Sequence, residues 1–525
     1  MTRVNKIRRF MCAMKHGLRT SHFFIARLWR TGNSPLFPCR RLFLAFSPLF
    51  IFLSGCAVGP NYKRPVVNVP TDFRGQEGAA QQASFADLPW WEVFKDETLK
   101  TLVQTALKNN YDLRIAVTRV EQSRQLAAQA RSQFFPFVNY STSISGGRNE
   151  LGGSVVTNGG ETQGGFVGLI SAAWEADVWG RIRRLNESAK AQYLSTEDAK
   201  RGVMLSLVSD VAQSYFELLG LYLQLEIAKE NTESFNQTLK LFTQRLEGGV
   251  ASKLQTSRAA AAQATAAATI PEFERQIAIK ENQISVLLGQ NPGPIALKSR
   301  LLEEIIPPEI PVGLPSALLE RRPDVLAVEE QVRSANAQIG VATAAFFPQI
   351  GLTTFLGHVS GPLSEFSSGI GNAWSFAGNI AGPIYQGGAL KAQKRLAIAA
   401  WEQAKLQYEL TALNAFQDVS NALISRQKYD AIRTEQLREV QAYEESVKVA
   451  LLRYNAGKAS YFEVLDAQQL LFPAQNDLAI TELNRRVVIV QLYKSLGGGW
   501  NLKDAEWIGN PPATNAPTPP TNPNP

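Results

Sequence analysis

The side chains that could ligate a metal or act as a nucleophile are concentrated at the start of the chain. Residues 57–525 contain one histidine, His358, one methionine, Met204, and no cysteine. Metal-ligating clusters of Cys, His or Met are therefore excluded there, and no nucleophile–base–acid set or phosphate-binding loop follows Cys56. The sequence predicts neither an enzyme nor a resident cofactor. The other cysteines and histidines all come earlier: Cys12, His16, His22 and Cys39.

Cys56 directly follows an apolar run. Residues Leu42–Leu53, LFLAFSPLFIFL, come after Arg40 and Arg41, and a largely apolar run of twelve residues is typical of a signal peptide and too short to span a bilayer. The next residues, LSGC, resemble the lipobox of bacterial lipoproteins, in which the cysteine is acylated and becomes the first residue of the mature protein. Each buried CH₂ of an acyl chain contributes about 0.8 kcal/mol to membrane binding. We therefore expect lipidation at Cys56. The alternative is a chance cysteine after an ordinary signal peptide. By the same resemblance, Ala57 in place of Asp favours sorting to the outer membrane.

The positive charge of the chain belongs to this presequence. The formal net charge is +8, yet residues 1–55 hold ten of the 54 Lys and Arg and none of the 46 Asp and Glu. The remainder therefore carries a net charge of −2. A nucleic-acid-binding protein keeps its basic patch in the folded part, so this class is disfavoured.

The rest of the chain repeats itself with a period near 210 residues. YDLRIAVTRVEQSRQLAAQARSQFFPFV (111–138) aligns with PDVLAVEEQVRSANAQIGVATAAFFPQI (323–350) at an offset of 212, and RLEGGVAS (245–252) aligns with RYNAGKAS (453–460) at an offset of 208. This period is too long for a solenoid and indicates a duplicated domain. The expected division is a presequence at 1–55, an anchored segment at 56–89, two structural repeats at 90–310 and 316–500, and a proline-rich disordered tail at 501–525.

Both halves show the same predicted order of elements. A helix comes first and ends at Phe-Phe-Pro, because the residue before a proline is pushed to extended geometry. Two strand-like stretches follow, separated by a polar Gly/Ser-rich loop, which holds His358 in the second half. A very long helix and a return helix complete each half. The expected helices are 98–134, 181–247 and 253–289, then 316–346, 388–455 and 461–496, and the expected loops are 145–165 and 358–372.

The long predicted helices need partners. Each could reach about 100 Å and cannot bury an apolar stripe against itself. Four strands per chain likewise cannot close a barrel. The sequence therefore predicts an oligomer with a β part and a long helical part. On 388–455, a seam with coiled-coil spacing consists of Leu406, Leu410, Leu413, Phe416, Val419 and Leu423.

Each long helix is expected to end in a sharp reversal. Gly249 and Gly457 stand where a left-handed C-cap residue would lie. Three residues later, Ser252 and Ser460 begin capping-box patterns that end at Gln255 and Glu463.

An ordered set of motifs resembles the outer membrane efflux protein family, the TolC-like group. Each motif is weak alone, whereas the set runs from residue 56 to about residue 501 and covers both halves. The resemblance is to the lipoprotein branch that partners resistance–nodulation–division pumps. The motifs are GPNYKRP (59–65), WWEVFKDETLKTLVQTALKNNYDL (90–113), WEADVWGR (174–181), RRPDV (321–325), RYNAGKAS (453–460) and DAQQLL (466–471).

This resemblance implies an α+β membrane protein and a function. The fold would be a homotrimer in which four strands from each chain form a 12-stranded outer-membrane β-barrel, continued by a long α-helical barrel in the periplasm. The function would be a passive exit duct for small molecules, docked to a periplasmic adaptor and driven by an inner-membrane pump. The alternatives are a lipid-anchored periplasmic coiled-coil scaffold without a pore and the outer-membrane duct of a secretion system. The cargo and the identity of the adaptor and pump are left open.

The resemblance also suggests a gate. In the family, aspartates constrict the periplasmic end just after the second reversal, and the matching positions here are Glu463 and Asp466. Residues three apart share a helix face, and three copies would form a ring of carboxylates that can tune ion passage. For Glu463 the competing interpretation is a capping partner of Ser460. Gln255 stands where other members can carry an acid, so the ring here holds less charge.

The reversals 245–252 and 453–460 resemble the tips that meet the adaptor. The residues expected there are Arg245, Gly249, Ser252, Arg453, Gly457 and Ser460. The competing interpretation of the two arginines is that they offset the helix dipole.

Five further residues have expected places. Asp210 and Asp418 are expected on a solvated helix face. Trp174, Trp179 and Trp374 flank the strands and suit an aromatic belt at the membrane interface, with packing at the barrel–helix junction an equal alternative for Trp179.

Overall fold

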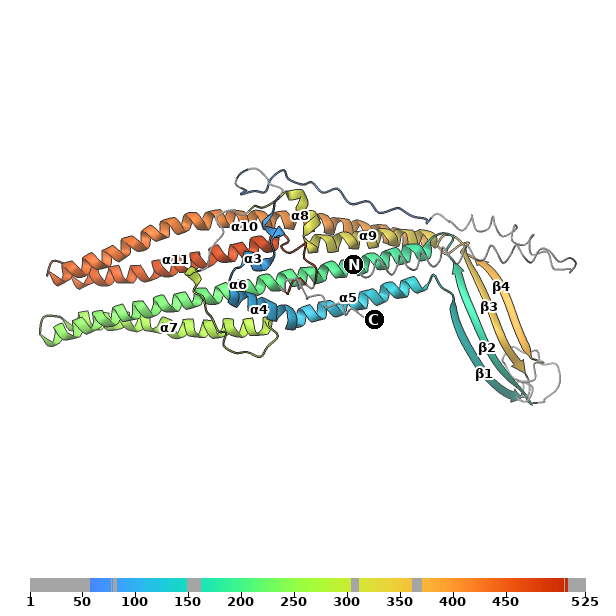
Figure 1. Cartoon of the computed structure of the whole chain (residues 1–525), viewed down its shortest axis with the longest axis horizontal. Helices are drawn as coiled ribbons and strands as arrows, with labels where there is room; N and C mark the ends of the chain where they lie inside the picture. The colour runs from blue at the N-terminus through green and yellow to red at the C-terminus, as the bar shows by residue number, and fades with distance from the viewer. Residues whose placement is uncertain are drawn as a thin grey trace, which may run out of the picture. The chain divides into compact units, whose positions relative to one another are not determined.

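The computed structural model (Figure 1) describes residues 57–76, 78, 83–148, 162–303, 311–360, 371–504 and 506–508. Cys56, the predicted lipidation site, lies outside these ranges. None of the helices in the described part of the chain is both long enough and apolar enough to cross a membrane.

The helix predicted at the start of each half is broken in two. In the first half, α4 (Glu97–Asn109) and α5 (Tyr111–Ser132) meet at Asn110, whose backbone leaves the helical region. The Asn110 side chain contacts two helix ends. Its Oδ1 accepts from the Leu113 N–H at the start of α5 at 3.0 Å, and its Nδ2 donates to the carbonyl of Leu287, the last residue of the return helix, at 3.0 Å. In the second half, α8 (Pro315–Arg321) and α9 (Pro323–Ala344) meet at Arg322, which precedes a proline and adopts an extended conformation.

The long helices are present as predicted. The helix α6 (Arg181–Glu247) and the helix α10 (Ala389–Asn455) contain 67 residues each, about 100 Å of helix. Both begin after a glycine with positive φ, Gly180 at 78° and Gly388 at 87°. The return helices are α7 (Lys253–Leu287) and α11 (Tyr461–Ser495).

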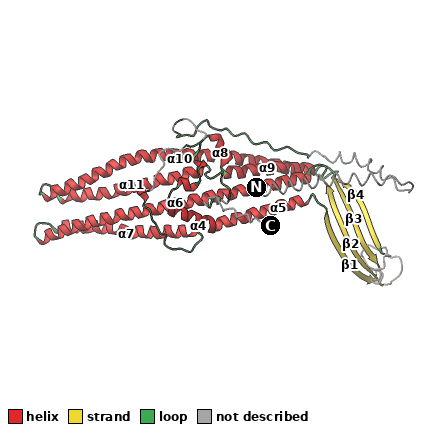
Figure 2. Cartoon of the chain, viewed as in Figure 1, coloured by secondary structure: helices red, strands yellow, loops and turns green. Residues whose placement is uncertain are grey.

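Neighbouring helices build the core. Figure 2 shows the helices running alongside one another; α6 packs against α5, α7, α9 and α11, and α10 packs against α9 and α11. Half of the predicted seam on α10 is buried within one chain. Phe416, Val419 and Leu423 are buried, whereas Leu406, Leu410 and Leu413 are 63%, 50% and 58% exposed.

Four antiparallel strands form one sheet in the order β1-β2-β3-β4. They are β1 (Phe137–Arg148), β2 (Thr162–Ala176), β3 (Gln349–Ser360) and β4 (Asn372–Ala381). The strands therefore extend into both expected loops, of which residues 149–161 and 361–370 lie outside the described ranges. His358 does not lie in a loop: it is in β3, opposite Gly168 and Asn372. Gly and Ser are weak strand formers alone, yet here Gly146 pairs with Gly164 along the ladder.

The chain after residue 500 stays in contact with the fold for several residues. Trp507, inside the predicted tail, is 3% exposed, and its carbonyl accepts a hydrogen bond from the Trp90 indole at 3.0 Å. The apolar pair Trp507 and Ile508 provides the reason, since the prolines begin only at Pro511. Residues 509–525 lie outside the described ranges.

Candidate functional site

The second reversal joins α10 to α11 and holds the predicted gate. Gly457 has φ +71°, and its N–H and that of Lys458 close the end of α10 on the Tyr454 and Arg453 carbonyls. The Ser460 N–H donates to the Glu463 carboxylate at 3.4 Å, and Arg453 Nη1 lies 3.1 Å from the same carboxylate. Glu463 is therefore both the predicted capping partner and half of a local ion pair.

Asp466 differs from Glu463 in its surroundings. It lies one turn further along α11, is exposed, and has no hydrogen bond or ion pair to any other residue in the described ranges. Its carboxylate is therefore exposed and unpaired within the described part of the chain. The structure does not test whether either acid closes a channel, so the gate stays a prediction.

The first reversal joins α6 to α7 with the same backbone. Gly249 has φ +72°, and Ser252 and Gln255 form the predicted capping box, with the Ser252 N–H donating to the Gln255 amide at 2.9 Å. Arg245 does not extend freely from this tip. Its guanidinium stacks 4.5 Å above the Tyr454 ring and donates to Asn455 Oδ1 at 3.4 Å, so it links the two reversals.

A small buried cluster holds the two helix pairs together near the tips. The rings of Phe242 on α6 and Tyr461 on α11 have centroids 3.9 Å apart, and Tyr454 lies 5.4 Å from Phe242. Burial, followed by the nearby Tyr454, raises the pKa of Tyr461 to about 12. Deeper along α11, the Gln468 amide donates to the Ser234 and Thr238 hydroxyls of α6 at 3.0 and 3.1 Å. Sequence reasoning missed this cluster, although aromatic residues on both sides of a predicted reversal were a usable signal.

Exposed apolar side chains surround both tips. On the first tip they are Val250 and Leu254, 80% and 62% exposed, and on the second Leu452 and Phe462, both 62% exposed. Sequence reasoning pointed to the arginines and did not consider these four residues.

The two aspartates expected on a solvated face, Asp210 and Asp418, are exposed as predicted, and each also forms an ion pair. Asp418 accepts from Arg322 at 2.9 Å, and Arg322 also contacts Asp324 at 2.7 Å and donates to the Ser495 carbonyl at 3.2 Å. Arg322 is mostly buried, which works against its charge, but the two carboxylates raise its pKa overall. Asp210 pairs with Lys494 at 3.4 Å. Arg322 and Asn110 thus share one contact: each donates to a carbonyl at the end of a return helix, α11 for Arg322 and α7 for Asn110.

The sheet has one apolar and one polar face. Pairing places a row of four apolar residues across all strands on one face: Tyr140, Ile170, Leu356 and Trp374, which are 85%, 57%, 66% and 76% exposed. Adjacent residues point to the opposite face because side chains alternate along a strand. That next row consists of Asn139, Ser171, Phe355 and Ser375.

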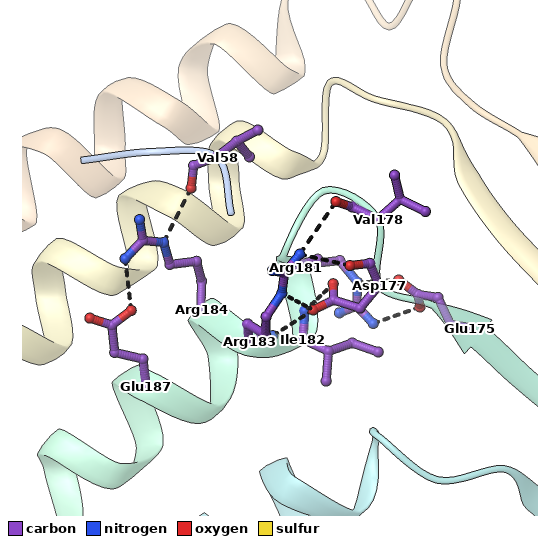
Figure 3. A network of polar contacts seen from close by, with 9 residues as sticks. All are labelled: Val58, Glu175, Asp177, Val178, Arg181, Ile182, Arg183, Arg184 and Glu187. Atoms are coloured by element: carbon purple, nitrogen blue, oxygen red, sulfur yellow. Dashed lines mark hydrogen bonds and ion pairs between the residues drawn. The ribbon is translucent and has the colours of Figure 1, made fainter. Parts of the chain in front are cut away.

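The turn between β2 and α6 is held by a polar network (Figure 3). The Asp177 carboxylate accepts from the Ile182 and Arg183 N–H groups at 2.9 Å each and so caps α6. Arg181 contacts both oxygens of Glu175 at 2.9 and 2.7 Å. The three tryptophans expected at the membrane interface lie in two kinds of place. Trp374 is exposed on the apolar face of the sheet. The indoles of Trp174 and Trp179 lie at the helix junction, where they donate to the Phe134 and Pro348 carbonyls respectively.

The model of the outer membrane efflux protein family matches residues 102–290 and 314–498, one match in each predicted half. The chain belongs to the outer membrane efflux protein family.

Individual relatives match this chain over most of their length. The cation efflux system protein CusC of Escherichia coli O6:H1 is 33% identical over 472 residues, which cover 88% of this chain and 99% of the relative. The probable outer membrane lipoprotein SilC of Salmonella typhimurium is 34% identical over 465 residues, 87% of this chain and 98% of that one. The solved structure of the outer-membrane channel OprN superimposes with a TM-score of 0.79 at 32% identity, over 85% of this chain and all of that one.

As an outer membrane efflux protein, the chain is a transport protein of the outer membrane that extends into the periplasm. The predicted family and function are confirmed. No group of three or more His, Cys, Asp or Glu side chains in the described ranges is placed to hold a metal ion. The assignments of the gate and tip residues stay predictions.

Proposed function

We propose that three copies of the chain close into one ring, a 12-stranded barrel in the membrane above a helical tunnel, and that this ring is the passive exit duct of a tripartite efflux system. The observation that carries this proposal is that the chain is open on both sides. The strand β1 and the helix α5 that precedes it form one side, and β4 and the helix α10 that follows it form the other.

The open strand edges need partners. Among the described residues, β1 pairs only with β2 and β4 only with β3. In a bilayer each unpaired backbone group costs several kcal/mol, so only closed sheets are stable there. The apolar row that contains Tyr140 and Trp374 would face lipid, and the polar row that contains Asn139 and Ser375 would face the lumen.

Exposed apolar side chains on α5 and α10 also support closure of three copies into a ring. On α10, Leu406, Leu410 and Leu413 are exposed in the single chain, and on α5 Ile115 and Leu126 are 46% and 61% exposed. Packing α10 of one copy against α5 of the next would bury both sets and complete the predicted coiled-coil seam.

Disulfide cross-linking tests the closure. Asn139→Cys is combined with a cysteine at Ala373, Ser375 or Ala377, which lie on the same face of the sheet, because the register between copies is free to vary. We expect at least one pair to give covalent oligomers up to the trimer under non-reducing conditions. The control pair, Ser171→Cys with Phe355→Cys, lies in register between β2 and β3 and should cross-link only within a monomer. If every β1–β4 pair stays monomeric, the ring is wrong and a scaffold without a pore becomes the better account.

Membrane attachment and domain division belong to the same proposal. We propose acylation of Cys56, after removal of 1–55, in a chain whose relative SilC carries the name of a probable outer membrane lipoprotein. The anchored segment would be 56–89, followed by the repeats 90–310 and 316–500 and the tail 501–525. Mass spectrometry of the mature N-terminal peptide tests the acylation, and an unmodified cysteine would contradict it.

The gate is proposed to rest mainly on Asp466. Glu463 already has two local partners, Ser460 and Arg453, whereas Asp466 has none among the described residues. Three Asp466 carboxylates around a common axis would attract cations and hold water at the narrow end.

The tips are proposed to meet a periplasmic adaptor through apolar contacts. Val250, Leu254, Leu452 and Phe462 supply the exposed apolar surface, while Arg245 and Arg453 are occupied within the chain. Phe462→Ser should therefore reduce efflux in cells that lack another outer-membrane duct, with the amount of trimer unchanged. The same change at Leu470, 45% exposed and two turns deeper on α11, is the control and should leave efflux intact. The cargo would be chosen by the inner-membrane pump.

A further inference from the structure

Two of the sequence motifs have no assigned part in the gate or the tips, and the structure brings them together. GPNYKRP (59–65) lies near the start of the described chain, and WEADVWGR (174–181) runs from the end of β2 through the turn to the start of α6. The Val58 N–H donates to the Trp179 carbonyl at 3.0 Å. Ala57 lies against Gly180, where a Cβ would come within 2.6 Å of the Ala57 Cα.

Residues 58–64, here called the N-terminal strap, run along one stripe of α9. The Gly59 backbone touches Gly340, with space for no Cβ between them, and the Asn336 amide donates to the Pro60 carbonyl at 3.0 Å. Arg333 lies 4.8 Å above the Tyr62 ring, and Glu329 accepts from the Tyr62 hydroxyl at 3.1 Å. At the end of the strap, Arg64 pairs with the same Glu329 at 2.8 Å.

These contacts share a register. The stripe residues 329, 333, 336 and 340 step by four, three and four, so they lie on one face of α9. Eleven helical residues rise about 16 Å, and the five extended steps from residue 59 to residue 64 also span about 16 Å. The strap therefore matches the stripe along its whole length, in the antiparallel direction.

Arg184 of α6 forms the other wall of this site (Figure 3). Its guanidinium donates to the Val58 carbonyl at 3.2 Å, the Gly59 carbonyl at 3.3 Å and Asn61 Oδ1 at 2.8 Å. Glu187 accepts the remaining contact at 2.8 Å. Arg184 is only 4% exposed, and most of its acceptors belong to the strap. A buried guanidinium needs such acceptors, so the site is built to hold a peptide.

We propose that the groove between α6 and α9 is a peptide-binding site for the strap, and that it acts as a ruler that fixes the height of the membrane anchor relative to the β2–α6 turn. One residue, Ala57, separates the strap from Cys56 in the sequence, and two Cα–Cα steps span about 7 Å, so the strap would keep an acylated Cys56 close to that turn. The role in fixing the anchor height, here called the ruler, depends on the proposed acylation of Cys56. The binding of the strap to the groove does not depend on it.

Trypsin cleavage after Lys63 in the detergent-solubilised protein tests the peptide site. Lys63 is exposed, but a protease must first lift the strap from α9. Arg184→Gln should speed this cleavage by about tenfold. The control Arg201→Gln removes an exposed arginine of the same helix and should change nothing. If Arg184→Gln does not fold, Gly340→Ala takes its place, because its methyl would collide with Arg184, and Gly202→Ala is its control, with space around it. Unchanged cleavage in the folded variants overturns the peptide site.

A flexible four-residue insertion tests the ruler. Gly-Ser-Gly-Ser between Ala57 and Val58 gives the anchor about 13 Å of slack while the strap stays intact. The control places the same insertion between Pro65 and Val66, beyond the strap, where Val66 is 92% exposed. We expect a severalfold loss of heat-labile trimer from the outer membrane with the first insertion only. Equal amounts with both insertions, whether high or low, contradict the ruler. Acylation is read separately by mass spectrometry of the N-terminal peptide, so a failure of that proposal is distinguishable.

Discussion

The two halves of the chain share a backbone and differ in chemistry. Both reversals use a glycine near φ +70° and a capping box, and both junctions use one residue to cap the neighbouring helix. At aligned positions, however, the first tip carries Gln255 and Arg258, and the second carries Glu463 and Asp466. The helix junctions diverge in the same way, with Asn110 in the first half and Arg322 in the second.

This difference shows which features serve folding and which serve function. A duplicated unit must keep the turns and caps that let it fold, so those recur. Charges on exposed helix faces are free to change without affecting folding. Function is therefore best sought where the halves disagree, and at the tips that criterion selects Asp466.

The largest effect is expected at the two helix junctions. Arg322→Ala removes two ion pairs to half-exposed carboxylates, Asp324 and Asp418, together with the hydrogen bond to the Ser495 carbonyl, and should lower the free energy of unfolding by about 2 kcal/mol. Asn110→Ala removes a cap and should cost about 1 kcal/mol. Thermal unfolding of the detergent-solubilised protein, followed by circular dichroism, measures both. If both variants lose the same free energy of unfolding, the charged Arg322 stabilises its junction no more than the neutral Asn110 stabilises the other.

The two reversal glycines should respond alike. Gly249→Ala and Gly457→Ala place a side chain at positive φ, and neither Cβ would have a neighbour within 4 Å. Only backbone strain is added, so each should cost about 1 kcal/mol in unfolding free energy. The same thermal scans apply. A difference of more than about 1 kcal/mol between the two variants would show that the tips are not equivalent in folding.

The sequence was sufficient to predict these repeated features. Gly249, Gly457 and the capping boxes depend on neighbouring residues only, and the duplication placed the long helices to within a residue. The break at Arg322 was missed although Pro323 directly follows it, which is a local signal for extended geometry. The break at Asn110 was missed because its amide donates to the end of a helix 177 residues away. His358 was misplaced because glycine-rich strands obtain their stability from pairing across the sheet, which local propensity does not contain.

The candidate site was predictable only in part. Glu463 and Asp466 were selected by family resemblance, but only the structure shows that Glu463 forms an ion pair with Arg453. The stacking of Phe242 on Tyr461 and the contact of Arg245 with Tyr454 depend on how two distant reversals meet. The aromatic residues on both sides of the second reversal indicate a buried cluster, but they do not indicate which residues of the first reversal they contact.

A smaller effect on stability, and a clear one on conduction, is expected at Asp466. Asp466→Asn should raise the basal conductance of the reconstituted protein severalfold, because it removes the unpaired carboxylate of the second tip. Asp477→Asn is the control: it lies eleven residues further along α11, on the same helix face and about 16 Å from position 466. A leak from the control that equals that of Asp466→Asn would show that charge anywhere on this face controls conduction.

The smallest effect is expected at Glu463. Glu463→Gln gives the second tip the residue that already caps the first, at Gln255. The capping bond can persist, and the loss of the exposed pair with Arg453 should cost about 0.5 kcal/mol or less. Basal conductance should stay at the wild-type level. A leak as large as that of Asp466→Asn would mean that both acids form the gate.

The central claim, that the open edges of this chain close into a conducting ring, is tested most directly by planar-bilayer recording. The purified protein is first shown to migrate as a heat-labile trimer and is then added to the bilayer. We predict stepwise conductance increments that are lost when the trimer is dissociated by heat. A protein that is monomeric under these conditions and gives no conductance would contradict the account.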